Sequence, residues 1–464
     1  MPDILLTHGY FLYEDPKELQ IMKPYAPLGI LYLCSHLQAK GFDVEVFDTT
    51  FSTRDALIAR LHTGTPSVLG IYANLMTRAN VVELLGIARE AGWTTIVGGP
   101  EPGAYAQEYL DAGAQYVVMG EGEATLEELL TALQSGSMAN MSSITGIAYL
   151  DDGVMRQTGS RTQIACLDDQ PWPARRSINI HQYVKTWRDA HGKGSVNFIT
   201  ARGCAYRCRW CSHQVYGQTH RRRNPLMVVD EVEWLLQEYS PDMVWVSDDV
   251  FTIHHDWLRK YAAEMRRRGL HIPFECISRA DRLNDEMMEI LAELGCFRVW
   301  IGSESGSQRI LDSMDRGVKL EQVQKAVELS RTHGIQSGMF LMWGYEGEEI
   351  ADIEATVQHV SKSQPDLFFT TVSYPIKGTP YYQKVQDRLV QLAPWGKSSD
   401  REIKIRGRHS RRFYGFADKL LRSEVQLAKL AQAAAMDDLE ASRLRVEISE
   451  MRANLIAAAD EVEA

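Results

Sequence analysis

The chain has 464 residues, which is too long for one ordinary hydrophobic core and predicts two domains with an appendage. Hydrophobic residues make up 45% and charged residues 24%, close to globular averages, so the composition excludes a disordered, collagen-like or membrane-embedded protein. With 50 Lys and Arg against 61 Asp and Glu, the net charge is −11, which argues against nucleic acid as a general partner.

The cysteines and the first residues bear on the compartment. Met1-Pro2-Asp3 leads directly into a strand-like run, and no stretch approaches the ~20 apolar residues of a membrane-spanning helix, so we expect a cytoplasmic protein. The seven cysteines are an odd number, and three of them crowd into one short segment. This pattern favours metal or redox chemistry over a disulfide framework.

The first third of the chain alternates β-rich runs with helical stretches. The expected strands are Asp3 to Gly9, Asp43 to Asp48, Ser67 to Asn74, Thr94 to Gly99 and Tyr116 to Glu121. Apolar residues recur at helical spacing over Leu28 to Lys40, Arg78 to Ala91 and Glu123 to Gln134. The alternation predicts an α/β, doubly wound, Rossmann-like domain over residues 1–140, with a parallel sheet covered on both faces.

In such a sheet, ligands bind beyond the carboxyl ends of the strands. Three loops lie at those ends: Ala73 to Thr77, Gly98-Gly99-Pro100 and Gly120-Glu121-Gly122. We therefore expect all three loops to face one site.

Residues 141–190 are expected to form a hairpin and a linker. Ile144 to Leu150 and Val154 to Thr158 flank the turn Asp151-Asp152-Gly153, and the polar, proline-bearing segment Asp168 to Pro173 follows.

Strand and helix signals alternate again over residues 191–395. The expected strands are Val196 to Arg202, Met243 to Ser247, Phe274 to Ser278, Phe297 to Ser303, Gln336 to Gly344 and Leu367 to Tyr374. Six such β-α units predict a partial (β/α)6 TIM-like barrel, whose functional residues should lie where strands end and loops begin.

The last segment, residues 396–464, is expected to be a helical extension. It opens with a basic run from Arg401 to Arg412 that includes one acid, Glu402. The run is consistent with a surface for an anionic substrate or a membrane, or with an ordinary solvated face. From Phe416 onward the chain lacks proline and glycine and is rich in Ala, Leu, Glu and Arg, which predicts one long helix.

Three cysteines, Cys204, Cys208 and Cys211, follow the first expected barrel strand at spacings of four and three residues. Iron–sulfur clusters usually have four thiolate ligands, so three local thiolates would leave one iron of a four-iron cluster open to another ligand. A zinc site is the alternative, with His213 and His220 as further ligands, but zinc sites typically pair their cysteines. The spacing favours the cluster.

This triplet, with Trp210 before its last cysteine, resembles the defining motif of the radical S-adenosylmethionine enzymes. The resemblance implies that the open iron binds S-adenosylmethionine and that the reduced cluster cleaves it to a 5′-deoxyadenosyl radical, which abstracts hydrogen from the substrate. It also implies an electron donor such as flavodoxin or ferredoxin. The protein would aim the radical and exclude water.

Further motifs of that family follow at the strand ends. By resemblance, Glu304 and Arg279 hold the ribose or methionine part of S-adenosylmethionine, Asp248 makes another polar contact with it, and Trp210 belongs to the same site. Structural capping or ion pairing is an equally common role for such residues. Similar proteins read Gly-x-Pro-Gly-Glu after the fifth strand, whereas this chain reads Gly344-Tyr345-Glu346-Gly347-Glu348. No residue is assigned a proton-transfer role.

The three glycine-bearing loops of the first domain resemble those of the cobalamin-binding domain found in one branch of the same superfamily. The implied cobalamin-binding residues are Leu75, Met76, Thr77, Gly98, Gly99, Pro100, Gly120, Glu121 and Gly122. Simple strand-to-helix turns are the alternative interpretation of these glycines. The Asp-x-His-x-x-Gly motif is absent and Glu101 follows Gly98-Gly99-Pro100, so we expect no histidine of that motif on the cobalt.

The branch contains cobalamin-dependent methyltransferases and an anaerobic porphyrin cyclase. The resemblance therefore implies a methyltransferase that uses a 4Fe-4S cluster, S-adenosylmethionine and cobalamin. Its substrate would be an unactivated carbon of a small-molecule or a lipid- or tetrapyrrole-type compound, methylated through the 5′-deoxyadenosyl radical and methylcobalamin. Radical oxidation, cyclisation or rearrangement on the same scaffold is the first alternative, and a non-enzymatic cobalamin sensor is a remote one.

One basic run, His220-Arg221-Arg222-Arg223, lies soon after the cysteines. It could pair with a carboxylate or phosphate of a substrate, or with acidic neighbours such as Asp230 and Glu231.

Overall fold

The computed structural model describes residues 2–136, 138–432 and 438–463. The chain divides into two compact units, which we describe separately. The first comprises Met1–Ala205, Ser212–Trp245 and Ala393–Ser399, and the second comprises Tyr206–Cys211, Val246–Leu392 and Asp400–Ala464. No helix in the described ranges is both long and apolar enough to cross a bilayer.

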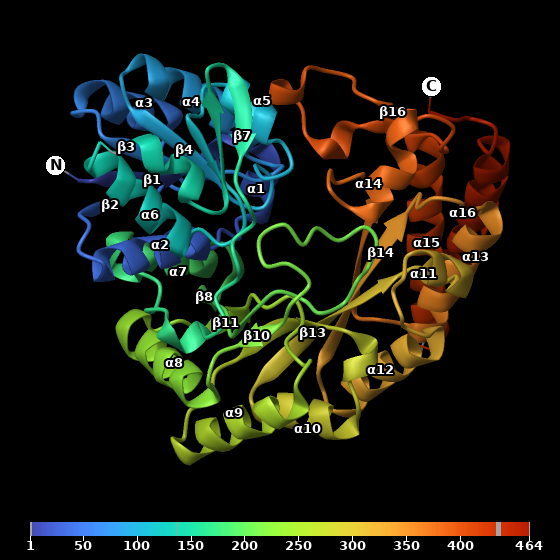
Figure 1. Ribbon diagram of the computed structural model, residues 1–464. Helices are drawn as coiled ribbons and strands as arrows, with labels where there is room; N and C mark the ends of the chain where they lie inside the picture. The colour runs from blue at the N-terminus through green and yellow to red at the C-terminus, as the bar shows by residue number, and fades with distance from the viewer. Residues whose placement is uncertain (1, 137, 433–437, 464) are drawn as a thin grey trace. The chain divides into compact units, whose positions relative to one another are not determined.

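The first unit contains a seven-stranded sheet with the strand order β2-β1-β3-β4-β5-β6-β7 (Figure 1). Its strands are β1 (Ile4–His8), β2 (Val44–Phe47), β3 (Val68–Tyr72), β4 (Thr94–Gly98), β5 (Tyr116–Val118), β6 (Ile147–Asp151) and β7 (Val154–Gln157). The first five strands pair in parallel, and β6 and β7 add an antiparallel hairpin at one edge. The parallel sheet and the hairpin are thus confirmed.

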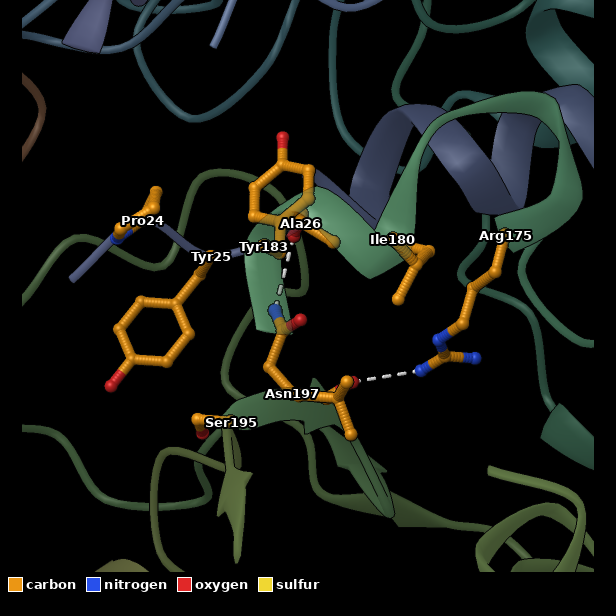
Figure 2. Close-up of a pocket in the computed structure, with 9 residues that line it drawn as sticks. Pro24, Tyr25, Ala26, Arg175, Ile180, Tyr183, Ser195 and Asn197 are labelled. Atoms are coloured by element: carbon orange, nitrogen blue, oxygen red, sulfur yellow. Dashed lines mark hydrogen bonds between the residues drawn. The ribbon is translucent and has the colours of Figure 1, made fainter. Parts of the chain in front are cut away.

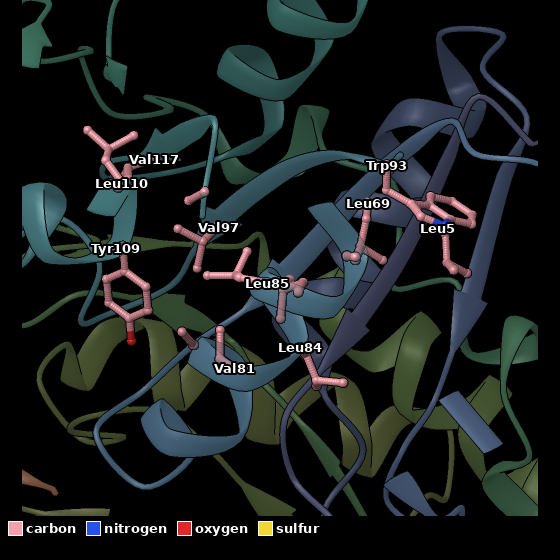
Figure 3. Close-up of a cluster of buried hydrophobic side chains, with 14 of the residues drawn as sticks. Leu5, Leu69, Val81, Leu84, Leu85, Trp93, Val97, Tyr109, Leu110 and Val117 are labelled. Carbon is pink, nitrogen blue, oxygen red and sulfur yellow. The ribbon is translucent and has the colours of Figure 1, made fainter. Parts of the chain in front are cut away.

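Helices cover both faces of this sheet, as Figure 1 shows. They are α2 (Leu28–Ala39), α3 (Arg54–Thr63), α4 (Arg78–Glu90), α5 (Ala106–Asp111) and α6 (Glu123–Gln134), whereas the short helix α1 (Pro16–Ile21) buries none of its residues. One buried cluster joins α3, α4 and α5 to the sheet and includes Leu69, Leu85 and Trp93 (Figure 3). A second joins α2 and α6 to the opposite face. Because the parallel strands β1, β3, β4 and β5 pack side chains against helices on both faces, the domain is doubly wound, as expected.

The remaining elements of the first unit precede and follow the cysteine motif. They are α7 (Ile180–His191), β8 (Ser195–Phe198), β9 (Ala201–Arg202), β10 (Arg221–Arg222) and α8 (Pro225–Tyr239). The expectation of one strand over Val196 to Arg202 is wrong, because β8 ends at Phe198 and β9 pairs instead with β10 in an antiparallel ladder. The backbone N–H of Arg223 extends this ladder by donating to the Thr200 carbonyl at 2.9 Å.

The second sheet has six strands in the order β15-β14-β13-β12-β11-β8, which gives the open six-stranded architecture expected for the partial barrel. Its further strands are β11 (Met243–Val246), β12 (Phe274–Ser278), β13 (Cys296–Glu304), β14 (Gln336–Trp343) and β15 (Leu367–Val372). Strands β12 to β15 pair in parallel. Their intervening helices are α9 (His255–Arg267), α10 (Asp285–Glu293), α11 (Gln308–Ser313), α12 (Leu320–Thr332) and α13 (Ile350–Ser363).

The C-terminal segment corrects the expectation of one long helix. After α14 (Pro380–Val385) and the antiparallel pair β16 (Leu389–Val390) and β17 (Lys404–Ile405), it forms two helices, α15 (Arg411–Gln432) and α16 (Asp438–Ala457). The two helices pack on each other, and α15 also packs on α13. A single extended helix would leave the apolar residues of both segments in water, whereas the pair buries Leu421 and Leu444.

The basic run from Arg401 to Arg412 extends into the first turn of α15 and is partly neutralised by acids near the end of the chain. Arg408 pairs with Glu463 and Arg412 pairs with Glu461. These pairs agree with a structural role for the run.

Candidate active site

The second unit holds two of the three motif cysteines in a loop that is anchored at its centre. Arg209 donates its backbone N–H to the Met314 carbonyl at 3.0 Å and accepts from the Tyr381 N–H at 2.9 Å. Cys208 is buried, and its carbonyl accepts from the Cys211 N–H at 3.1 Å. The backbone, and not only the side chains, therefore fixes this loop.

Two arginines approach the Cys208 sulfur. Nη1 of Arg316 lies 3.7 Å from the sulfur and Nη1 of Arg279 lies 4.0 Å from it. A hydrogen bond from the Cys211 thiol and the two guanidinium charges outweigh burial and lower the pKa of the Cys208 thiol to about 6, while the same hydrogen bond raises the pKa of the Cys211 thiol. Of this pair, Cys208 therefore favours the thiolate, which is the form that ligates iron.

Arg279 itself is held by several groups. Its guanidinium lies 3.5 Å from the centre of the Tyr206 ring, its Nε donates to Asp281 at 2.8 Å, and its Nη2 donates to the Arg316 carbonyl at 2.9 Å. The side chain is buried, so these contacts compensate for its lost hydration. Both predicted and unpredicted residues thus form one cationic wall beside Cys208.

Glu304 lies at the end of β13 in a left-handed backbone conformation, with φ of +63°. Its carboxyl oxygen is 3.9 Å from Nε of Arg316, while Nη2 of Arg316 donates to the Gly302 carbonyl at 2.9 Å. Burial raises the pKa of Glu304 to about 7, against the opposing effect of Arg316. A φ of this kind is costly for a non-glycine residue and is typical of functional sites.

Trp210 and Asp248 occupy different surroundings. Trp210 packs on the apolar cluster of Met314, Met342 and Tyr345, and its ring meets the Tyr345 ring edge-on at 6.5 Å between centroids. Asp248 is buried just after β11, where burial and its carboxylate together raise the pKa of Tyr261. The structure therefore brings together Cys208, Cys211, Arg279 and Glu304, and Trp210 lies in the apolar cluster next to Cys211. Beside a hydrogen bond with Cys296 and burial, the Asp248 carboxylate also raises the pKa of Cys276.

Arg316 is the residue that the sequence did not identify. It lies between Asp315 and Gly317, both of which have positive φ, in the turn after α11. The sequence Asp-Arg-Gly signals a turn, but nothing in it links this arginine to a cysteine 108 positions earlier.

The loop after β14 departs in sequence from similar proteins but still forms a compact turn. Gly344 and Gly347 have φ values of +71° and +81°. The Gly344 N–H donates to the Glu348 carboxylate at 2.5 Å, and the Glu348 N–H donates to the Tyr345 carbonyl at 3.0 Å. Tyr345 takes a buried position against Tyr381.

The third cysteine, Cys204, is half-buried in the first unit. Within the described ranges no three His, Cys, Asp or Glu side chains are grouped for a single metal ion. A four-iron cluster places its cysteine ligands on separate iron atoms, so its thiols need not converge on one point. The low pKa of the Cys208 thiol and the adjacent cations suit thiolate ligation of such a cluster.

The three loops predicted to bind cobalamin follow the adjacent strands β3, β4 and β5. The Ala73 N–H donates to the Gly98 carbonyl at 2.8 Å, which joins the first two loops. Gly99 has φ of +121°, and a Cβ there would collide with the Ala73 carbonyl oxygen. At Gly120, with φ of +82°, an added Cβ would find only ordinary contact. Met76 is 52% exposed. These loops leave backbone and apolar surface for a large ring.

The residue after Gly98-Gly99-Pro100 points to the interior. Glu101 accepts from Nε of Arg78 at 2.6 Å and from the Tyr109 hydroxyl at 2.8 Å, and all three side chains are buried. Arg78 begins α4 directly after the first loop and also donates to the Ser398 carbonyl at 3.0 Å. This ion pair therefore ties the first loop to the second, and its carboxylate is already bound by the protein.

The arginines of the basic run after the cysteines, Arg221, Arg222 and Arg223, bind other groups of the protein. Arg223 pairs with Glu231, Arg221 donates to Glu121 at 2.6 Å, and Arg222 donates to the Thr200 hydroxyl at 2.9 Å. Of the two readings of this run, pairing with acids of the protein accounts for Arg221 and Arg223.

The first unit also contains a pocket that lies apart from the predicted cofactor-binding residues. Figure 2 shows Pro24, Tyr25, Arg175, Ile180 and Asn197 around it. Arg175 donates to the Asn197 carbonyl at 2.8 Å, and the Asn197 amide donates to the Ala26 carbonyl at 3.0 Å. None of the predicted cofactor-binding residues lines this pocket.

Comparison with protein families gives two matches along the chain. Residues 21–130 match the B12 binding domain, and residues 198–360 match the Radical SAM superfamily. The first match spans the three glycine-bearing loops and the second spans the cysteine motif.

Among curated relatives, an uncharacterized methyltransferase of Pyrococcus horikoshii is 28% identical over 387 residues, covering 80% of this chain and 81% of the relative. The anaerobic magnesium-protoporphyrin IX monomethyl ester cyclase of Rubrivivax gelatinosus is 26% identical over 383 residues, covering 80% of this chain and 68% of the cyclase. Among solved structures, the radical S-adenosylmethionine methyltransferase TsrM from Kitasatospora setae, with cobalamin and a 4Fe-4S cluster bound, aligns with a TM-score of 0.72 at 18% identity, over 99% of this chain and 100% of that one. The structural likeness supports the fold.

The two family matches agree with the cofactors expected from the sequence. They imply a 4Fe-4S cluster and S-adenosylmethionine for the Radical SAM domain and cobalamin for the B12 binding domain. The residues that hold each group remain those proposed from the motifs.

Proposed function

We propose that this chain, which belongs to the radical S-adenosylmethionine superfamily and carries a B12 binding domain, is a radical C-methyltransferase acting on a small molecule. The observation that carries the proposal is the presence of both domains in one chain. A radical-generating domain activates an unactivated C–H bond, and cobalamin carries the methyl group that replaces the hydrogen. Tetrapyrrole and lipid-type substrates fall within the same proposal.

We propose specific roles for the protein's own residues. Cys204, Cys208 and Cys211 ligate the cluster, and Arg279 and Arg316 stabilise the Cys208 thiolate. Glu304 and Arg279 bind polar groups of S-adenosylmethionine, with Trp210 packing at the same site and Asp248 as a further polar contact. In the first domain, the backbone of the loops bearing Leu75, Met76, Thr77, Gly98, Gly99, Pro100, Gly120, Glu121 and Gly122 contacts cobalamin. When bound, the reduced cluster supplies the electron that cleaves S-adenosylmethionine.

We propose that no side chain of this domain coordinates the lower face of the cobalt. The Glu101 carboxylate, which follows Gly98-Gly99-Pro100, already binds Arg78 and Tyr109. A weakly held lower face would favour one-electron chemistry at the cobalt.

We also propose that the chain works in the cytoplasm, with a flavodoxin- or ferredoxin-type electron donor. The support for the compartment is that all seven cysteines are free thiols.

The proposal is tested by anaerobic reconstitution of the full chain with cobalamin, a strong reductant and S-adenosylmethionine labelled at its methyl group. Candidate substrates are drawn from products of neighbouring genes. Labelled methyl in a product together with 5′-deoxyadenosine supports methyl transfer. If 5′-deoxyadenosine forms with each substrate but label enters no product, methyl transfer is overturned.

Radical oxidation or cyclisation is the second candidate, because the cyclase of Rubrivivax gelatinosus covers as much of this chain as the methyltransferase relative does. The same assay separates the two: a product that has lost hydrogen without gaining methyl favours the cyclase-type reaction.

A further inference from the structure

Glu121 lies in the third predicted cobalamin loop, yet its side chain faces the protein. One carboxylate oxygen accepts from Nη1 of Arg202 at 2.8 Å, and the other accepts from Nη1 of Arg221 at 2.6 Å and from the Ile164 N–H at 2.8 Å. Arg202 also pairs with Glu123 at 2.7 Å. The side chains of Glu121, Arg202 and Glu123 are 4 to 6% exposed, so this network is screened little by solvent.

Arg202 and Arg221 come from the two strands of one small ladder. They are register partners in β9 and β10, and Arg202 stands two residues before Cys204. The Arg202 guanidinium also lies 5.0 Å from the centre of the Tyr32 ring and 5.7 Å from that of Tyr216. The network therefore joins the loop after β5 directly to the strand that enters the cysteine motif.

Buried, charge-assisted and two-pronged contacts of this kind are directional and leave little freedom to either partner. A shift of the loop after β5 must move the Glu121 carboxylate, and a moved carboxylate must displace Arg202 or leave buried charges unpaired. Leaving buried charges unpaired is costly in free energy. The two segments therefore move together.

We propose that Glu121 and Arg202 are positioning residues that couple cobalamin binding to the conformation of the cysteine motif around Cys204. The inference rests on the cobalamin and cluster sites of the proposed function. Cobalamin seated on the third loop holds Glu121, and Glu121 through Arg202 holds the strand leading to Cys204. The enzyme would thereby order its cluster loop when its methyl carrier is in place.

The first unit offers a matched control. Glu231 is a second buried carboxylate between two arginines, accepting from Arg175 at 2.5 Å and pairing with Arg223. Figure 2 shows Arg175 beside Asn197, in the pocket that none of the predicted cofactor-binding residues lines. Glu231→Gln thus makes the same chemical change as Glu121→Gln without touching a cobalamin loop.

The test uses the purified full chain before cluster reconstitution, with cyanocobalamin as probe. An absorbance titration gives the cobalamin Kd, and mass spectrometry follows the alkylation rate of Cys204 with and without saturating cobalamin. In the wild-type chain, cobalamin should slow alkylation of Cys204 about tenfold, because it depopulates the open loop. In Glu121→Gln, the Kd should rise about tenfold and the protection of Cys204 should shrink to less than about twofold. Glu231→Gln should behave as wild type.

The inference is overturned if cobalamin protects Cys204 equally in the wild type and in cobalamin-saturated Glu121→Gln. It is also overturned if Glu231→Gln loses as much of this protection as Glu121→Gln does. A wild-type chain that binds cobalamin without protecting Cys204 also overturns it. A wild-type chain that binds no cobalamin instead overturns the cobalamin site of the proposed function, and this inference with it.

If Glu121→Gln fails to fold, as judged by circular dichroism, Arg202→Lys replaces it with Arg175→Lys as its control. Lysine keeps the charge but lacks the planar fork that reaches Glu121 and Glu123 together. The same loss of Cys204 protection is expected in Arg202→Lys alone, and its absence overturns the inference.

Discussion

Nη1 of Arg316 lies 3.7 Å from the sulfur of Cys208, although the two residues are 108 positions apart in the chain. The arginine is buried, and its charge is one of the causes that hold the pKa of the Cys208 thiol at about 6. This contact combines a local motif with a distant residue.

Replacing Arg316 by methionine should make Cys208 a weaker acid. Loss of the nearby positive charge destabilises the thiolate, so the pKa should rise by about one unit. The measurement is the pH dependence of Cys208 alkylation in the chain without cluster, read peptide by peptide. Arg309→Met is the control, since Arg309 pairs with Asp352 and not with Cys208. An unchanged pH midpoint in Arg316→Met would show that its charge does not act on the thiol.

Cys208→Ala should abolish cluster assembly and 5′-deoxyadenosine formation while leaving cobalamin binding intact. An iron of the cluster loses its thiolate, whereas the glycine-bearing loops of the first unit are untouched. Iron and sulfide content, deoxyadenosine yield and a cobalamin titration check this. Cys166→Ala, at an exposed free cysteine, is the control. A biological response to cobalamin that survives Cys208→Ala would instead support the sensor alternative.

Gly99→Ala should weaken cobalamin binding and stability together. Gly99 has φ of +121° and its Cβ position is blocked by the Ala73 carbonyl oxygen, so the two joined loops must separate. We expect a loss of about 2 kcal/mol in unfolding free energy and at least a tenfold rise in cobalamin Kd. Gly153→Ala is matched, because Gly153 also has positive φ, +78°, but open space around it. Equal effects of the two substitutions would contradict the role of the loop contact.

Glu348 should make stability fall as pH rises. Burial raises its pKa to about 8, so between pH 5 and pH 8 the folded chain retains a proton that the unfolded chain has released. Stability from this group is therefore present below the unfolded pKa and is lost as pH rises through the folded pKa, by roughly 2 to 4 kcal/mol. Glu348→Gln should flatten this slope in urea unfolding of the chain without cofactors. A slope between pH 5 and pH 9 that is equal in both chains would refute the assignment.

Local patterns anticipated most of the elements near the sites. The strand Phe274–Ser278 and the helix Glu123–Gln134 have their expected bounds, and the strand from Thr94 ends at Gly98, one residue before the expected Gly99. Apolar periodicity and glycine or proline breaks act over a few residues, which explains this agreement. The same locality explains the errors. Val196 to Arg202 reads as one strand, but Arg202 pairs with Arg221, 19 positions later in the sequence, and that partner cannot be inferred from the run itself.

The sequence by itself determined the spacing of Cys204, Cys208 and Cys211, the β-α alternation of both sheets and the glycines at their strand ends, because these are properties of neighbouring residues. Only the tertiary structure decided which charges meet. Arg316 lies against the Cys208 sulfur, and Arg78 donates to Glu101. In the basic run, Arg221 donates to Glu121 and Arg222 donates to Thr200. Ion pairs depend on distance in space, and in this chain folding brings together groups that are 22 to 108 positions apart in the sequence.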